Sequence, residues 1–115
     1  MPEGRVYELR TYYATPKKMP ALLKRFENHT LGFFRKYGMT VEGFWLAADS
    51  SESEQKLVYL MSYPSKEDAK KSWDCFRADP DWIAARNASE QPEGQMLTTR
   101  IESLFLDPVS FSPMK

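Results

Sequence analysis

The stretch TPKKMPALLKRFENHTLGFFRKYG, residues 15–38, decides the fold because it predicts one long amphipathic helix. Thr15 followed by Pro16 predicts the start of this helix, and Gly38 predicts its end. The apolar side chains recur every three or four residues and line up one helix face, at Met19, Leu22, Leu23, Phe26, Phe33, Phe34 and Tyr37. His29 falls on or beside that face, where a buried imidazole would need a hydrogen-bond partner.

The composition excludes several classes of protein. The chain has 115 residues, enough for one domain with its own core, and its 16 basic side chains balance 16 acidic ones. Balanced charge provides no field that would attract nucleic acid or an anionic membrane surface. No stretch approaches the ~20 apolar residues of a membrane span, and Met1 to Arg5 contains no hydrophobic signal segment. We therefore expect a cytoplasmic protein with no nucleic acid partner and no membrane insertion.

Alternation of apolar and polar residues predicts the remaining elements. Four segments read as strands, at residues 5–13, 39–48, 56–63 and 95–106. Two further helical segments begin at the capping residue Ser65 and at Asp79 with Pro80. Residues 49–55 read as a turn, and the tail 107–115 is expected to be extended. The order βαββαβ predicts an α+β fold of ferredoxin-like plait, a four-stranded antiparallel sheet with its helices on one face.

A single layer of helices leaves the other face of the sheet open. In the first strand, alternation divides the side chains between two faces. One face carries Tyr7, Leu9, Thr11 and Tyr13, and the other carries Val6, Glu8, Arg10 and Tyr12. The second set is polar for a core and suits a cavity or a wet dimer interface. We expect an apolar patch on the open face, formed by Tyr12, Trp45, Tyr59 and Met61. A second copy packed face to face would cover this patch, so the sequence predicts a homodimer.

Several short motifs resemble the NIPSNAP family, a branch of the dimeric α+β barrel superfamily. They occur in the family's order along nearly the whole chain: YELRTY at 7–12, RFENHT at 25–30, YGM at 37–39, GFW at 43–45, LVYLMSY at 57–63, SW at 72–73, DPDW at 79–82 and FSP at 111–113. The resemblance implies one domain over residues 1–115 that pairs into a dimeric barrel. It also implies the single-domain bacterial form of the family, whose members share no agreed activity.

The dimeric α+β barrel superfamily includes oxygenases that act without a metal, isomerases and haem-degrading enzymes. By this analogy His29 would be a general base and Arg10 would stabilise negative charge. Tyr12, Trp45 and Tyr59 would position a flat ligand, with Arg86 at the cavity mouth. We expect no metal and no cofactor, since one histidine and one cysteine make a poor ligand set, although haem binding through His29 is a minor alternative.

Each of these residues also has a structural interpretation. His29 would then be a hydrogen-bonded residue at the edge of the core. Arg10, Glu8, Arg100 and Glu102 would form ion pairs that fix the dimer register instead of binding a carboxylate or enolate. The three aromatic residues would fill a dimer core.

The sequence therefore leaves two functions open, and it does not establish whether the chain is an enzyme. The first is binding of a small apolar or aromatic, anionic molecule in a barrel cavity, with cofactor-independent oxygenase or isomerase chemistry. The alternative is a non-enzymatic homodimeric module for protein interaction, which uses the extended aromatic tail.

Overall fold

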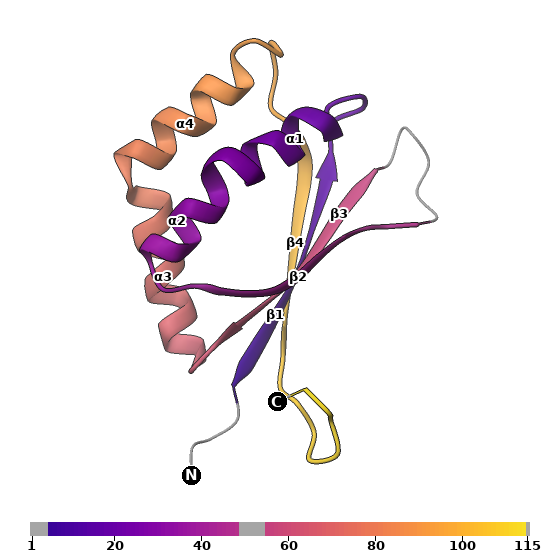
Figure 1. The fold of residues 1–115 in the computed structure, drawn as a ribbon, viewed down its shortest axis with the longest axis vertical. Coiled ribbons are helices and arrows are strands. Elements are labelled where there is room, and N and C mark those ends of the chain that lie inside the picture. Colours follow the sequence, from indigo (N-terminus) through magenta and orange to yellow (C-terminus); the bar gives the residue numbers. More distant parts are fainter. Residues whose placement is uncertain (1–4, 49–54, 115) are drawn as a thin grey trace.

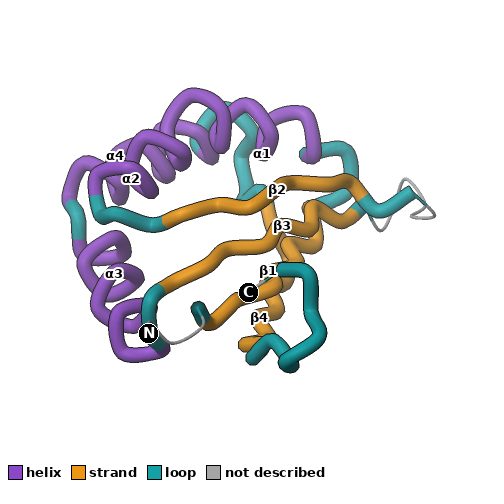
Figure 2. The backbone as a smooth tube through the Cα atoms, turned by 60° about the horizontal axis from the view of Figure 1, so that its bottom comes forward, coloured by secondary structure: helices purple, strands orange, loops and turns teal. Residues whose placement is uncertain are grey.

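The chain forms one antiparallel sheet with a layer of helices on one face (Figures 1 and 2). The computed structural model describes residues 5–48 and 55–114. The elements in chain order are β1 (Val6–Ala14), α1 (Met19–Arg25), the π-helical turn η1 (Phe26–Thr30), α2 (Leu31–Lys36), β2 (Thr40–Leu46), β3 (Lys56–Tyr63), α3 (Lys66–Ala78), α4 (Pro80–Glu90) and β4 (Thr98–Leu106). The strand order is β2-β3-β1-β4, which confirms the predicted ferredoxin-like α+β architecture. The predicted turn at 49–55 lies outside the described residues except for its last position.

The predicted first helix is a continuous run of α1, η1 and α2. It begins at Met19 and not after Thr15, because the Thr15 hydroxyl donates to the Met96 carbonyl at 2.7 Å and caps nothing. The predicted end is confirmed: Gly38 has φ +67°, and Met39 N–H donates to the Phe34 carbonyl at 2.8 Å in a Schellman-type cap. The cap turns the chain from the helix layer back into β2.

The π-helical turn changes which residues of this run are buried. The backbone N–H of Leu31 donates to the carbonyl of Phe26, five residues back, so one extra residue is accommodated in the turn. Phe26 and Thr30 are buried, whereas His29 is exposed. The expectation that His29 lies on the buried stripe or at its edge is therefore wrong, because it depends on the period of a regular α-helix.

Strand register decides which side chains lie beneath the helices. Arg10 is opposite Tyr59 on β3 and Ser103 on β4, and these three positions share the helix-covered face. Tyr12, Tyr59 and Met61 are buried on the same face, so their predicted place on the open face is wrong. Trp45 alone of that predicted patch lies on the open face, where it is 55% exposed.

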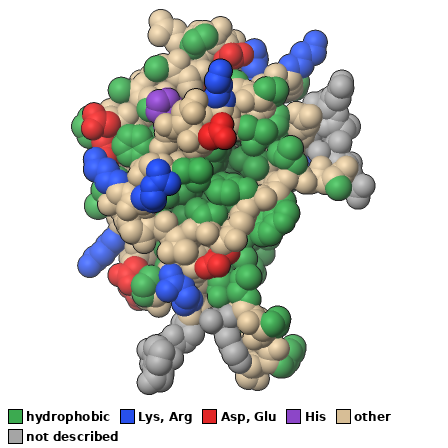
Figure 3. All heavy atoms as spheres, in the orientation of Figure 1, with side chains coloured by type: hydrophobic (Ala, Val, Ile, Leu, Met, Phe, Trp, Pro, Cys, Tyr) green, Lys and Arg blue, Asp and Glu red, His purple; other side chains and the backbone are tan. Residues whose placement is uncertain are grey.

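The core between sheet and helices is dense in aromatic side chains. Tyr59 is fully buried and lies within 5.4 Å of Phe26 and 6.1 Å of Phe34, measured between ring centroids. At the β2 edge the core opens into a hydrophobic groove beside α1, where the space-filling view shows apolar side chains gathered (Figure 3).

None of the helices in the described part of the chain combines the length and the apolar character that a membrane crossing requires.

Asp79 fixes α4 against the first helical run. Its carboxylate caps α4 by accepting from the N–H of Asp81, and it also accepts from Lys36 Nζ at 2.6 Å and the Tyr37 hydroxyl at 2.5 Å. The Lys36 and Tyr37 hydrogen bonds lower the pKa of Asp79 to about 2. The predicted helix start at Ser65 is confirmed as well, because its hydroxyl accepts from the N–H of Asp68.

Gly32 inside the first helical run and Gly38 just after its end allow a matched test of the cap. Gly38→Ala is expected to lower the free energy of unfolding by about 1 kcal/mol, because an L residue is disfavoured at positive φ. No atom within 4 Å would meet the added methyl group, so the cost lies in the backbone alone. Gly32→Ala, inside α2, is expected to raise stability by about 0.5–1 kcal/mol. Urea denaturation measures both, and an unchanged Gly38→Ala would contradict the assigned cap.

Candidate functional site

A charged pair lies in β1 at the base of the helix layer. Glu8 and Arg10 are 2% and 6% exposed, and Glu8 Oε2 accepts from Arg10 Nη1 at 2.9 Å. Strand alternation places both on the covered face, and burial of two charges is tolerated only where hydrogen bonds compensate the lost water. The sequence predicted a larger cluster, but Arg100 and Glu102 pair with each other on the opposite face, so that prediction is wrong.

Donors from three further elements converge on the Glu8 carboxylate. Tyr63 OH donates at 2.6 Å and Trp73 Nε1 at 2.9 Å, and the Ser103 hydroxyl completes the set from β4. Burial alone would raise the pKa of Glu8, but the bonds from Ser103 and Tyr63 and the charge of Arg10 outweigh it and hold the pKa below 4.5. Glu8 is therefore an ionised carboxylate that accepts hydrogen bonds at both oxygens.

The guanidinium of Arg10 links Glu8 to two tyrosines. Its Nε donates to Tyr59 OH at 3.0 Å and its Nη2 to Tyr12 OH at 3.2 Å, and its central carbon lies 4.0 Å from the Trp73 ring centroid. Burial lowers the pKa of Arg10, but Tyr12, Tyr59 and Glu8 together raise it above its ordinary value. Arg10 therefore stays cationic. Its orientation is fixed by its contacts with Glu8, Tyr12, Tyr59 and Trp73.

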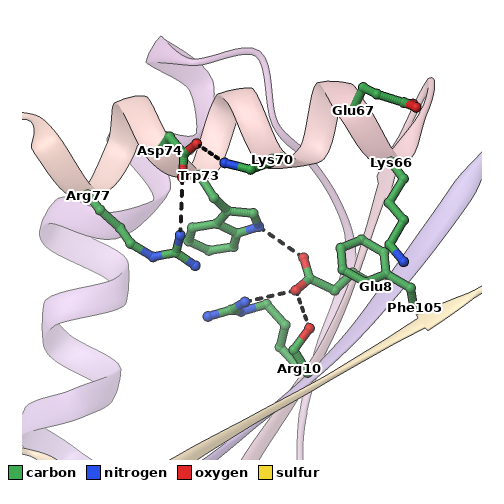
Figure 4. A pocket seen from close by; sticks show the side chains of 10 residues that line it. Glu8, Arg10, Lys66, Glu67, Lys70, Trp73, Asp74, Arg77 and Phe105 are labelled. Carbon is green, nitrogen blue, oxygen red and sulfur yellow. Dashed lines mark hydrogen bonds and ion pairs between the residues drawn. The ribbon is translucent and has the colours of Figure 1, made fainter.

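A cavity of about 500 Å³ opens above this network, between α3 and β4 (Figure 4). We call it the large cavity. Trp73 points from α3 toward Glu8, with Arg10 at the base of the cavity and Phe105 at its side. The cavity exists because β4 is an edge strand whose residues are mostly exposed, so the helices do not cover it.

A second hollow of about 210 Å³, the small cavity, adjoins the first. Arg10, Trp73 and Arg77 line both cavities. The small cavity extends toward α1 and α4, and its lining includes Tyr12, Arg25, Trp82, Arg86, Glu90 and Ile101. Arginine and aromatic side chains thus dominate this hollow.

The structure brings only some of the predicted site residues together. Arg10, Tyr12 and Arg86 line the small cavity, and Tyr59 is fully buried behind Arg10. Trp45 lies on the opposite face of the sheet, so it does not share a cavity with Arg10.

His29 borders a different surface hollow, next to Asn28, Ser89 and Glu93. It lines neither the large nor the small cavity, so the structure does not place the predicted base beside Arg10. Within residues 5–48 and 55–114, no group of three or more His, Cys, Asp or Glu side chains is arranged to hold a metal ion.

Sequence reasoning missed Trp73, Ser103 and Arg25 as site residues. The residue pattern around Trp73 contains no sign that its indole N–H faces a carboxylate. Ser103 and Arg25 belong to the site because of the strand register and the helix packing, which the residue pattern does not specify.

The fold and the cavity define an α+β plait with a polar, aromatic-lined pocket between its helices and the β1–β4 edge of its sheet. The chain belongs to the NIPSNAP family, whose model matches residues 7–113.

Two solved structures of NIPSNAP proteins share this fold. A NIPSNAP domain protein from Burkholderia xenovorans is 26% identical, with 94% of this chain and 98% of that chain covered and a TM-score of 0.77. A NIPSNAP family protein of unknown function from Agrobacterium tumefaciens is 21% identical, with 97% and 95% covered and a TM-score of 0.80.

More distant similarity extends to the fold alone. A candidate antibiotic biosynthesis monooxygenase from Nitrosomonas europaea is 10% identical, with 90% of this chain and 98% of that chain covered and a TM-score of 0.60. A search of curated proteins finds no match.

The buried pair predicts a pH-dependent stability. Glu8→Gln is expected to lower the free energy of unfolding by about 3 kcal/mol near neutral pH, because it leaves the Arg10 charge buried without its counterion. Since folding lowers the pKa of Glu8, its contribution is complete above pH 4.5 and is lost as the pH falls below that value. The difference between the wild type and Glu8→Gln should therefore shrink on acidification.

Urea denaturation at several pH values measures this difference. Glu102→Gln is the matched control, because Glu102 lies on β4 with its side chain 53% exposed, and it is expected to change stability by about 0.5 kcal/mol or less. A pH-independent effect of Glu8→Gln would contradict the assigned ion pair.

Proposed function

We propose that this chain binds a small aromatic or apolar molecule in the large cavity. One observation carries the proposal: a hollow of about 500 Å³ combines the apolar surfaces of Trp73 and Phe105 with the fixed polar groups of Glu8 and Arg10. Ligand sites are commonly concave, about 300–1,000 Å³ in volume, and mostly apolar with a few oriented polar groups. The Glu8 network supports a preformed site, because a bound molecule would not need to order these side chains.

The arrangement favours binding over catalysis. Glu8 accepts four side-chain hydrogen bonds and its pKa is lowered, which makes it a weak proton acceptor. The oxygenase or isomerase chemistry, with His29 as base, stays a prediction from the family resemblance. It would require a substrate that reaches the separate hollow beside His29.

A neutral aromatic probe tests the binding proposal. 2-Naphthamide is expected to bind the wild-type protein, and Phe105→Ala is expected to weaken this binding roughly fivefold because the ligand loses an apolar wall. Isothermal titration calorimetry measures the affinity, and NMR shift changes should centre on Trp73.

Leu106→Ala is the control, since Leu106 is the next residue of β4 and lies on the other face of the sheet. Absence of 2-naphthamide binding, or equal losses in both variants, would count against the large cavity as a ligand site.

A homodimeric interaction module is the second candidate function. It is favoured by the open sheet face, where Leu60, Leu9 and Leu104 form one row across three adjacent strands. Leu104 is 57% exposed and Trp45 beside this row is 55% exposed, so a second copy would remove apolar surface from water. In the tail, the 87% exposed side chain of Phe111 offers a further contact for a partner protein.

Sedimentation velocity tests the homodimer. The wild-type protein is expected to sediment as a dimer and Leu104→Lys as a folded monomer, because a second copy would have to cover a charged side chain in the apolar row. Leu23→Lys is the control on α1, where the side chain is 37% exposed in the helix layer. A monomeric wild type would reject the module.

A further inference from the structure

Arg25 carries an unexplained polar group. Its side chain is 6% exposed, yet Nε is the single buried side-chain nitrogen or oxygen atom without a hydrogen-bond partner in the described part of the chain. Buried N–H groups are nearly always paired, because an unpaired one costs about 1–3 kcal/mol. An unpaired guanidinium N–H beside a cavity therefore points to an acceptor that the protein does not supply.

The existing bonds of Arg25 leave one edge of its guanidinium unused. Nη1 donates to Ser89 Oγ and to Glu90 Oε2, both at 3.3 Å. Nε and Nη2 share the opposite edge, which matches the two oxygens of a carboxylate. The plane is held beside Trp82, whose ring centroid lies 5.6 Å from the central carbon.

The small cavity that Arg25 lines is rich in positive charge. Arg10, Arg77 and Arg86 also line it, against one acidic residue, Glu90. The Arg86 side chain is exposed and makes no hydrogen bond or ion pair with the described residues. Burial lowers the pKa of Arg25, and the nearby charge of Arg86 lowers it further, while Glu90 opposes both effects. A negative group in the cavity would relieve this repulsion.

Charge and shape together indicate the class of anion. Glu8 pairs with Arg10 and Glu90 pairs with Arg25, whereas Asp74 is shared between Lys70 at 2.7 Å and Arg77 at 3.8 Å. Arg86 has no acidic partner in the described part of the chain. The small cavity therefore carries excess positive charge, and the flat Nε and Nη2 edge of Arg25 matches the two oxygens of a carboxylate.

We infer that the small cavity is a carboxylate subsite, in which the Nε and Nη2 edge of Arg25 and the guanidinium of Arg86 hold one carboxylate group. Arg10, Trp73 and Arg77 border both cavities, so a ring against Trp73 and an acid group beside Arg25 fit a single aromatic carboxylic acid. This choice of ligand class rests on the proposed function, whereas the carboxylate subsite itself depends only on the arginines.

A pair of isosteric probes separates the charge from the ring. 2-Naphthoate is expected to bind the wild-type protein at least ~10-fold more tightly than 2-naphthamide. Arg25→Lys keeps the positive charge but removes the two-pronged edge, and Arg86→Gln removes a cation. Each is expected to weaken 2-naphthoate binding at least ~5-fold and to leave 2-naphthamide binding unchanged.

The control is Arg35→Lys in α2, since Arg35 is exposed and lines neither cavity. Equal affinity of the two probes, or losses in Arg25→Lys that are the same for both, would overturn the subsite, because a purely structural role of Arg25 would affect both ligands alike.

Acetate tests the subsite without any ring. The Arg25 Nε–H signal, assigned by its loss in Arg25→Lys, is expected to shift downfield in ¹⁵N NMR spectra as acetate is added, and an unmoved signal would overturn the subsite. A shift with acetate combined with no binding of either naphthalene probe would reject the proposed aromatic ligand while supporting the carboxylate subsite.

Discussion

The Glu8 carboxylate and the Arg10 guanidinium lie 2.9 Å apart beneath the helices, and the rest of the site depends on this pair. Two charges in that position lose several kcal/mol of hydration, which only close geometry and further hydrogen bonds offset. Tyr63, Trp73 and Ser103 donate to Glu8, while Tyr12 and Tyr59 accept from Arg10. The pair thereby connects three strands and α3 through polar contacts inside an otherwise aromatic core.

The position of the pair follows from the strand order. β1 lies between β3 and β4, and β4 is an edge that the helices leave uncovered. Polar groups on β1 therefore face the core on the β3 side and a cavity on the β4 side. Arg10 belongs to both environments, because it hydrogen-bonds the buried Tyr59 and also lines both cavities. A network that holds the core together thus also forms the base of the candidate site.

The single helix layer leaves two surfaces with different chemistry. The space toward β4 is lined by arginines and aromatic rings, which suits a small anionic ring compound. The opposite face of the sheet carries Trp45 and a row of leucines, which suits a second protein surface. The proposed ligand binding and the proposed self-association would use opposite faces of the same strands, so they would not compete.

The sequence by itself determined the element types, their order and the family. Periods of two and of three to four residues, together with caps such as Ser65 and Gly38, are local properties that one chain segment encodes. Tertiary structure alone decided which strand face is covered, and so placed Tyr12 and Tyr59 inside and Trp45 outside. It also decided that His29 is exposed, through a hydrogen bond in η1 that spans five residues, and that Arg25 and Arg86 line the same cavity. These outcomes depend on strand order and helix packing, which join residues far apart in the chain, and periodicity does not encode them.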